Sequence, residues 1–178
     1  MEQRHPWAGV NEGDVAVLTL RDPIVETPRH GEDPAQCRSC RAVPDELEVF
    51  RDETWRVQLN ADTAFPGTCM LSPLRHATQV PDLTARELAS YGPMVARVSR
   101  ALSELSAGLA FRGARVARVH SHLWGDGGAH LHQWFFPRPY GYADLLGSTL
   151  VEWEETLPRA EQGQVLAAAA DLRQRLTR

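Results

Sequence analysis

The sequence has no long apolar run, no excess of basic residues and only three cysteines. No stretch approaches the roughly 20 apolar residues that a membrane-spanning helix needs, and the N-terminus has no basic segment followed by an apolar one. These absences predict a cytoplasmic protein without membrane contact. The formal net charge of -4 argues against a nucleic-acid polymer as partner, because proteins that bind a phosphate backbone usually carry a basic excess. A small nucleotide stays compatible with this charge, since a local site can be positive on an acidic protein.

Internal repeats and low-complexity tracts are also absent. With 178 residues, 43% of them hydrophobic, the chain is most simply one domain, long enough to bury a core. Residues 1–36 contain a single short strand candidate, residues 14–20, among Pro, Gly, Glu and Arg. We expect residues 1–36 to form an N-terminal arm that packs on the domain or on a partner subunit.

Two of the three cysteines, Cys37 and Cys40, form a Cys-x-x-Cys motif. This spacing brings two thiolates onto one tight turn, which suits tetrahedral zinc if two further ligands come from elsewhere. The alternative is a redox pair, but such a motif normally opens a helix after a strand, and the sequence around Cys40 does not have this pattern. Zinc is therefore favoured. The third cysteine, Cys69, has no visible partner and is expected to be a small core residue.

Local patterns predict a hairpin and a long helix. Residues 54–59 alternate apolar and polar side chains, and a second short strand, residues 68–72, follows a turn that contains Pro66 and Gly67. Asn60 ends the first strand, where the residue type alone favours a turn-forming role. A capping box at Thr84 and Glu87 opens a helix that ends near Gly108. Its apolar stripe is expected to be core or dimer interface, and consists of Leu88, Tyr91, Val95, Val98, Leu102 and Leu105. Pro93 predicts a kink or a late start.

Residues 125–138 contain the candidate catalytic residues. A glycine-rich turn is followed by β-prone aromatic residues, which predict a strand that ends at Pro137. On a strand, His130, His132 and Trp134 share one face. The strand of residues 114–123 is expected to pair with them across the glycine loop, with His120 and His122 on one of its faces. Loop N–H groups can hold a phosphate that a histidine then attacks, which points to phosphate chemistry.

Residues 130–138 resemble the histidine triad (HIT) signature, His-x-His-x-His-x-x followed by Pro-Arg, with Trp134 in place of the third histidine. The glycine-rich turn before His130 also resembles the galactose-1-phosphate uridylyltransferase branch of the superfamily, whose motif is His-Pro-His-x-Gln. This resemblance implies an α+β fold in which an amphipathic helix packs on an antiparallel sheet, and the Ala-rich residues 164–175 predict a C-terminal helix in addition. The resemblance extends from about Cys37 to Arg138. It implies a HIT-like domain over residues 37–140, a C-terminal extension over 141–178, and a homodimer paired through the helix and an edge strand.

The resemblance also assigns roles to residues of the site. It implies that His76 and His130 complete the zinc site of Cys37 and Cys40, and that this closed set holds a structural ion. Asn60 would bind the ribose hydroxyls of a small nucleotide. His132 would attack the α-phosphorus to give a nucleotidyl-histidine, which water or another acceptor resolves. Further residues complete the expected site: Gly127, Gly128 and Trp134 for substrate binding, and His120 or His122 as proton donor.

Two other interpretations stay open from the sequence. One is a nucleotide-binding module that kept a structural zinc and lost turnover, because the indole of Trp134 cannot exchange a proton near pH 7. The other is a metalloenzyme in which His130 and His132 bind a catalytic metal with His120 or His122. The metalloenzyme alternative assigns no role to Cys37 and Cys40.

Overall fold

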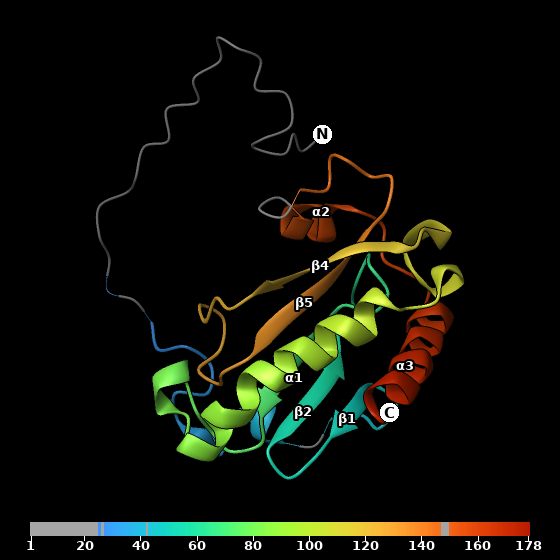
Figure 1. Ribbon diagram of the computed structural model, residues 1–178. Helices are drawn as coiled ribbons and strands as arrows, with labels where there is room; N and C mark the ends of the chain where they lie inside the picture. The colour runs from blue at the N-terminus through green and yellow to red at the C-terminus, as the bar shows by residue number, and fades with distance from the viewer. Residues whose placement is uncertain (1–24, 26, 42, 147–149) are drawn as a thin grey trace.

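The chain folds around one five-stranded antiparallel sheet with the strand order β1-β2-β3-β5-β4 (Figure 1). The computed structural model describes residues 25, 27–41, 43–146 and 150–178, so the strand expected at residues 14–20 lies outside the described residues. The strands are β1 Glu48–Arg51, β2 Trp55–Leu59, β3 Cys69–Pro73, β4 Val116–His122 and β5 Gln133–Pro139. The helices are α1 Ala85–Ser103, α2 Leu150–Thr156 and α3 Gln162–Leu176. This is the predicted α+β architecture.

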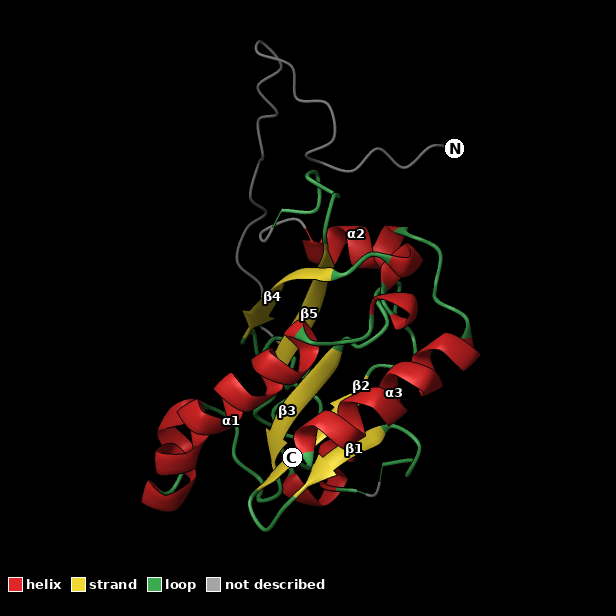
Figure 2. Cartoon of the chain, turned by 45° about the vertical axis from the view of Figure 1, so that its right-hand side comes forward, coloured by secondary structure: helices red, strands yellow, loops and turns green. Residues whose placement is uncertain are grey.

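Helices cover both faces of the sheet (Figure 2). Helices α1 and α3 pack on one face, where side chains such as Val57, Leu71 and Phe135 join the main core. The opposite face carries a second, smaller apolar cluster, in which Leu150 of α2 meets Phe136. None of the described helices is long and apolar enough to cross a membrane.

The predicted hairpin is confirmed as β2 and β3, with Leu59 opposite Cys69 and Trp55 opposite Pro73. Cys69 is 1% exposed and lies in the core, as expected. Strict alternation fails in β2, however, because Arg56 on the other face is only 4% exposed. The short strand β1 beside β2 was not predicted.

The strand that carries the expected motif begins later and ends later than predicted. It starts at Gln133, so His130 and His132 precede it, and it runs through Pro137 instead of ending there. Strand β3 pairs with β5 only as far as Phe135. Pro137 therefore has a ladder partner on the β4 side alone, where proline is better tolerated than between two paired strands. The alternation itself is confirmed: Phe135 is in the main core and Phe136 in the second cluster.

Helix α1 begins at the predicted capping box. The Thr84 N–H donates to the Glu87 carboxylate at 2.7 Å, and the Thr84 side chain accepts from the Glu87 N–H at 3.3 Å. The helix runs on through Pro93, so the late start was wrong. Leu88 is 48% exposed and does not belong to the buried stripe. Met94, Val98, Ala101 and Leu102 of α1 are buried in the core, and Tyr91 and Val95 of the predicted stripe pack against it.

The predicted C-terminal helix is confirmed as α3, which closes the core over β1 and α1. Five of its side chains are buried in the main core: Val165, Ala168, Ala169, Leu172 and Leu176. Arg173 also donates from Nη2 to the carbonyl oxygens of Asp45 at 2.9 Å and Glu48 at 3.0 Å. The helix thus covers strand β1, which lies at one edge of the sheet.

Candidate functional site

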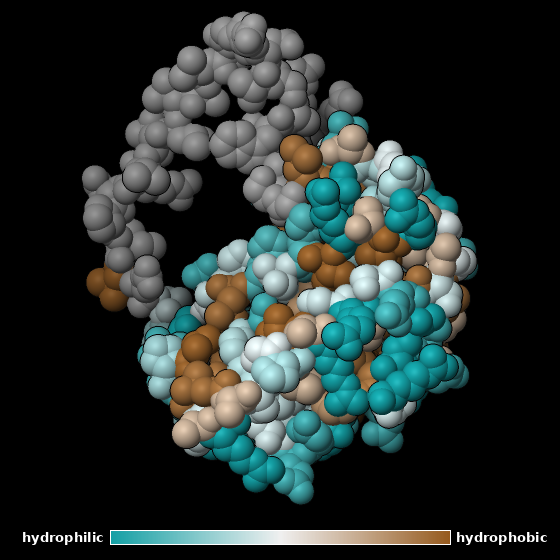
Figure 3. Space-filling model, in the orientation of Figure 1, coloured by the Kyte–Doolittle hydropathy of each residue, from teal (hydrophilic) through white to brown (hydrophobic). Residues whose placement is uncertain are grey.

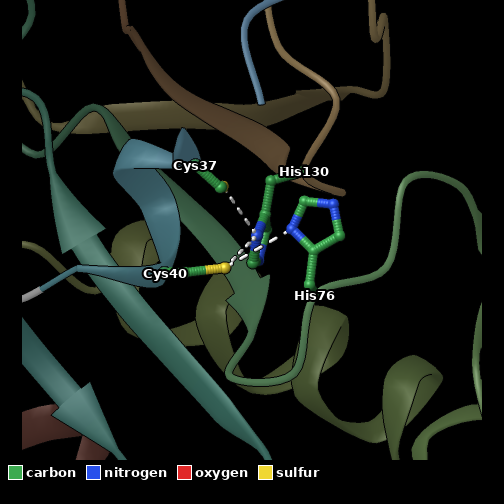
Figure 4. Close-up of side chains that lie close together, drawn as sticks. All are labelled: Cys37, Cys40, His76 and His130. Atoms are coloured by element: carbon green, nitrogen blue, oxygen red, sulfur yellow. Dashed lines mark hydrogen bonds between the residues drawn. The ribbon is translucent and has the colours of Figure 1, made fainter. Parts of the chain in front are cut away.

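Two cysteines and two histidines from three separate segments meet at one end of the sheet (Figure 4). The ligand atoms of Cys37, Cys40, His76 and His130 all lie within 4.8 Å of one another. His130 Nδ1 is 3.4 Å from Cys37 Sγ and 3.5 Å from Cys40 Sγ. His76 Nδ1 is 3.4 Å from Cys40 Sγ. The four residues that the resemblance named as ligands therefore form one cluster that is capable of binding a metal.

Short local structures bring these four side chains together. Cys37 is the N-cap of a 3-10 turn, Arg38–Cys40, and Cys40 is its last residue; the Cys40 N–H donates to the Cys37 carbonyl at 3.3 Å. Gly31 lets the chain pass close to this turn: its φ is +89°, and a Cβ there would lie 3.4 Å from Cys37 Sγ. His76 follows β3 and His130 precedes β5, so the sheet sets the distance between them.

Polar groups around the cluster orient its ligands. His130 Nε2 donates to the carbonyl of Pro73 at 2.9 Å, which leaves the lone pair of Nδ1 directed at the thiols. Arg56 of β2 donates to the carbonyl of Ser39 and, at 3.2 Å, to that of Arg41. The buried Arg56 was missed from sequence, because it occupies a position that alternation assigns to an exposed face. Its bonds hold the Cys-x-x-Cys turn against the sheet.

The charges of the cluster suit a cation. Burial lowers the pKa of His130, which keeps its imidazole neutral and able to coordinate. Burial and the neighbouring Cys37 raise the pKa of Cys40, since two thiolates repel each other without a cation between them. A divalent ion at the centre removes this repulsion. Two thiolates and two neutral imidazoles are a ligand set typical of tetrahedral zinc, so the residues fit the metal.

His132 lies beside the cluster but outside it. Its Nδ1 donates to the backbone carbonyl of His130 at 2.7 Å, which leaves Nε2 with a lone pair. The imidazole is half-buried. A Cβ on Gly128 would lie 3.9 Å from His132 Cε1, so the glycine loop passes close to the ring.

The glycine loop is held by the end of the expected N-terminal arm. Arg29 Nη1 donates to the carbonyl of Gly125 at 2.9 Å, and the Ala129 N–H donates to the carbonyl of His30 at 2.8 Å. His30 also forms a parallel bridge with Gly128. Sequence reasoning missed Arg29 and His30, because no periodic pattern or motif marks them. Gly127 has nothing within 4 Å of its Cβ position, so its surroundings are open.

Asn60 behaves locally as a turn residue and also lies at a cavity. Its Nδ2 donates to the carbonyl of Asp62 at 2.8 Å, and its Oδ1 accepts from the Asp62 N–H at 3.3 Å. The cavity beside it has a volume of about 360 Å³ and is lined by Trp134 among others. The turn role that the residue type favours is therefore present, together with access to a pocket.

The other two candidate histidines share a sheet face with Trp134. In the pairing of β4 with β5, His120 is opposite Phe136 and His122 is opposite Trp134. The ring of Trp134 lies at right angles to that of His132, with centroids 6.1 Å apart and an interplanar angle of 77°. Burial lowers the pKa of both His120 and His122, and their Nε2 atoms have no hydrogen-bond partner among the described residues. Both are thus neutral near pH 7.

Comparisons with known proteins give structural similarity only. The sequence matches no protein-family model and no curated protein. A hypothetical histidine triad nucleotide-binding protein from Sulfolobus tokodaii superposes with a TM-score of 0.57 at 16% identity, covering 79% of this chain and 92% of that one. A zinc-bound histidine triad family protein from Mycobacterium smegmatis gives a TM-score of 0.53 at 17% identity, over 74% and 84% of the two chains.

A uridylyltransferase structure is similar to the same degree, with a TM-score of 0.57 at 19% identity. The match covers 79% of this chain and 45% of the uridylyltransferase, so this chain corresponds to about half of that protein. Both kinds of structure named by the sequence resemblance thus share the arrangement of sheet and helices found here. The chain has a HIT-like α+β fold that carries a Cys2His2 cluster capable of binding a metal.

Proposed function

We propose that the protein is a HIT-like nucleotide hydrolase or nucleotidyltransferase that acts at the α-phosphate of a small nucleotide conjugate. The observation that carries this proposal is the hydrogen bonding of the two ring nitrogens of His132. Its Nδ1 is committed to the carbonyl of His130, and its Nε2 keeps a lone pair beside the glycine loop. A histidine fixed in one tautomer with its other nitrogen free is ready to act as a nucleophile.

In the proposed reaction, His132 Nε2 forms a bond to the α-phosphorus while the bond from phosphorus to the leaving oxygen or nitrogen breaks. The leaving group takes that electron pair and a proton. Water or another acceptor then attacks the phosphorus and gives its proton to the histidine that had protonated the leaving group, the bond to Nε2 breaks, and His132 and the proton donor are both regenerated. Backbone N–H groups of Gly127 and Gly128 stabilise the phosphate oxygens. The hydrogen bonds that Arg29 donates to Gly125 and that His30 accepts from Ala129 hold this loop in position.

The proton for the leaving group comes from His122 or His120. Trp134 stands where the third histidine of the motif is expected, and an indole N–H does not exchange a proton near pH 7. His122 is directly opposite Trp134 in the sheet and has an unbonded Nε2. This position opposite the missing third histidine supports it as the replacement donor.

We also propose that the Cys2His2 cluster holds a structural zinc ion. All four ligands come from the protein, so no coordination position is left for substrate. The similarity to a zinc-bound histidine triad family protein supports this assignment.

The enzyme proposal is tested by trapping the intermediate. The protein is mixed with dinucleoside polyphosphates, nucleoside phosphoramidates and nucleotide sugars, denatured, and weighed by mass spectrometry. We expect a nucleotidyl adduct on the parent and none on His132→Ala. If no substrate yields an adduct or a phosphorus-containing product, the protein is not a nucleotidyl enzyme.

A second candidate function is a nucleotide-binding module that keeps the zinc and has no turnover. Trp134 favours it, because its ring stacks on Phe136, with centroids 5.8 Å apart, and supplies no proton that exchanges near pH 7. Nucleotide binding with no adduct and no product would support this candidate. The third candidate, a catalytic metal on His130 and His132, has less support: His132 is not a member of the only ligand group among the described residues.

We further propose that the protein is a homodimer. Strand β4 is an edge strand, and Leu88 on α1 is 48% exposed. Apolar patches also lie among hydrophilic side chains on the face formed by α1 and α3 (Figure 3). Light scattering at micromolar concentration should give about twice the 19.8 kDa mass of the chain. A monomer mass would refute the dimer.

A further inference from the structure

A groove with a volume of about 560 Å³ lies between α1 and the end of α3. Its charged lining consists of Arg97, Arg100 and Glu104 from α1, and of Arg175 and Arg178 from the other side. The three α1 residues are spaced three and four apart, so they project from one side of that helix. Hydrophilic side chains gather where the two helices meet (Figure 3). Positive charge is thus concentrated in one groove of a protein whose net charge is -4.

Carboxylates hold the guanidinium of Arg175 in one place. Its Nε and Nη2 donate to the two carboxylate oxygens of Asp171, at 2.7 and 3.2 Å, and its Nη1 lies 3.5 Å from the Glu104 carboxylate. Asp171 also accepts from the N–H of Ser106 at 3.3 Å and from its hydroxyl at 3.2 Å, which ties α3 to the loop after α1. These pairs offset most of the charge of Arg175 and fix its position in the wall.

The other three arginines have no carboxylate partner in the part of the chain that the structure describes. The guanidinium carbon of Arg97 lies 4.7 Å from the ring centroid of Phe50, and a guanidinium that rests on a ring keeps its N–H groups for other acceptors. The side chains of Arg100 and Arg178 are exposed and form no ion pair or hydrogen bond with described residues. Three cationic groups therefore lie along the groove without a bound anion of their own, and they repel each other until one binds.

The groove is separate from the proposed active site and from the proposed dimer contacts. Helices α1 and α3 cover the main-core face of the sheet, whereas Trp134 packs in the cluster on the opposite face. Leu88 precedes Arg97 by nine residues, about two and a half helical turns, so the two side chains lie on opposite sides of α1. Helix α3 packs on β1, which is at the opposite edge of the sheet from β4. A dimer formed through Leu88 and β4 leaves the groove open.

The lining selects a compact anion. Guanidinium groups match phosphate, because two parallel N–H donors meet two phosphate oxygens. The apolar part of the described wall is Pro93, Ala96 and Ala101, which offers neither a ring for a base to stack on nor a pocket for the large apolar side chains that anchor a peptide. Small-molecule pockets have volumes of about 300 to 1,000 Å³, so the groove has room for several linked phosphates.

We propose that the groove is a second binding site, which takes a compact small molecule with two or more linked phosphate groups. Arg97 and Arg100 of α1 donate to the phosphates from one side, and Arg175 of α3 donates from the other. The ion pairs of Arg175 and the ring beneath Arg97 position two of these donors before the ligand arrives, which lowers the entropic cost of binding. The inference goes beyond the reaction at His132 and does not depend on it.

The test is isothermal titration calorimetry with inorganic orthophosphate, pyrophosphate and tripolyphosphate, in buffer without divalent cations. Affinity should rise with the number of phosphates, by about tenfold or more from orthophosphate to tripolyphosphate, because a longer chain reaches more guanidinium groups. Binding of tripolyphosphate should persist in His132→Ala. No binding of any of the three, or loss of binding in His132→Ala, would overturn the proposal. A glutamate-rich peptide that binds more tightly than tripolyphosphate would assign the groove to an acidic protein segment instead.

Three variants locate the binding in the groove. Arg100→Gln removes an unpaired guanidinium and should weaken tripolyphosphate by about tenfold. Arg86→Gln is the matched control: it removes the same charge from an exposed position on the same helix outside the groove, and affinity should stay within about twofold. Glu104→Gln should strengthen binding by about threefold, because Glu104 is the one carboxylate among the described residues that line the groove.

The comparison of Arg100→Gln with Arg86→Gln separates contact from general charge. All three side chains are exposed, so melting temperatures close to that of the parent are expected and check that the variants are folded. If Arg86→Gln weakens tripolyphosphate as much as Arg100→Gln does, only the overall charge attracts the anion and the proposal fails. Weaker binding in Glu104→Gln would also contradict it.

Discussion

Trp134 is the residue at which this chain differs most from the motif it resembles. It lies between the proposed nucleophile and the cavity beside Asn60, in contact with His132 on one side and Phe136 on the other. An indole at this point supplies stacking surface but no exchangeable proton. Under the proposed function, this one side chain would affect both the choice of leaving group and the binding of the nucleotide.

Restoring the histidine should therefore change the two kinetic constants in different directions. We predict that Trp134→His raises kcat at least tenfold for substrates with an amine leaving group, because general acids contribute about 10²- to 10⁴-fold. KM should rise as well, because the stacking surface is lost. The control is Trp134→Phe, which removes the indole and adds no proton donor. A rise in kcat in Trp134→Phe, or none in Trp134→His, would contradict the argument.

The pH profile identifies the proton donor in the parent. Burial lowers the pKa of His122 below its ordinary value of 6.5, so the protonated donor becomes abundant only in acid. We predict that the ratio of parent to His122→Asn turnover increases as the pH falls below 6.5, for leaving groups that need a proton. His120→Asn is the matched comparison on the same strand face, and the larger effect identifies the donor. A constant ratio in both variants would exclude both histidines.

At the scale of the element, the start of α1 is a compact electrostatic unit. Arg75 bonds to Glu87, and Thr84 donates to the same carboxylate, so the pKa of Glu87 is lowered to about 2. A lowered carboxylate pKa stabilises the fold above its ordinary value of 4.5, and this contribution is lost as the pH falls toward 2.

We predict that Glu87→Gln lowers the free energy of unfolding by about 2 kcal/mol at pH 7, as expected for buried hydrogen bonds to a charged group. The difference from the parent should shrink between pH 4.5 and 2. Denaturant unfolding at pH 7, 4 and 2.5 measures it. Glu53→Gln is the control: its pair with Arg86 is 2.6 Å long but exposed, so it should cost less than about 1 kcal/mol. An equal loss of unfolding free energy in the two variants would show that burial does not strengthen the interactions of Glu87.

What could be predicted from the sequence depended on whether the signal was local. The capping box of α1 and the hairpin of β2 and β3 lie within short stretches, and both were found. Strand β1 has four residues with no clear alternation, and α2 has seven, so neither gives a periodic pattern. The limits of β5 are set by where β3 and β4 end beside it, which no window of sequence around Pro137 records.

The same distinction applies to the site. The spacing of Cys37 and Cys40 is a local signal, and the family resemblance supplied His76 and His130. Arg56 and Arg175 carry no motif, and each acts through contacts with chain segments that are distant in sequence. Arg175 is 71 residues from Glu104, and Arg29 is 96 residues from Gly125. Contacts of this kind become visible only once the chain has folded.

At the scale of the whole molecule, the Cys2His2 cluster joins the Cys-x-x-Cys turn to the chain just after β3 and just before β5. We predict that a chelator or Cys37→Ser removes the metal and lowers the melting temperature strongly, because zinc binding contributes directly to folding. Elemental mass spectrometry and calorimetry measure the two effects. Cys69→Ala is the control: it also removes a thiol, but a core one, so the metal content should remain. Purified parent protein without zinc would refute the prediction.

The position of helix α3 at the end of the chain has a consequence for folding during translation. The five strands are complete once Pro139 has been made, but the main core closes only when the side chains up to Leu176 are added. At the usual 5 to 20 residues per second, synthesis of these 37 residues takes roughly 2 to 7 seconds. During that interval the apolar sides of α1 and β1 face water. A newly made chain is therefore most prone to aggregation in those few seconds, and a chaperone that shields it then will determine how much of the protein reaches its folded state.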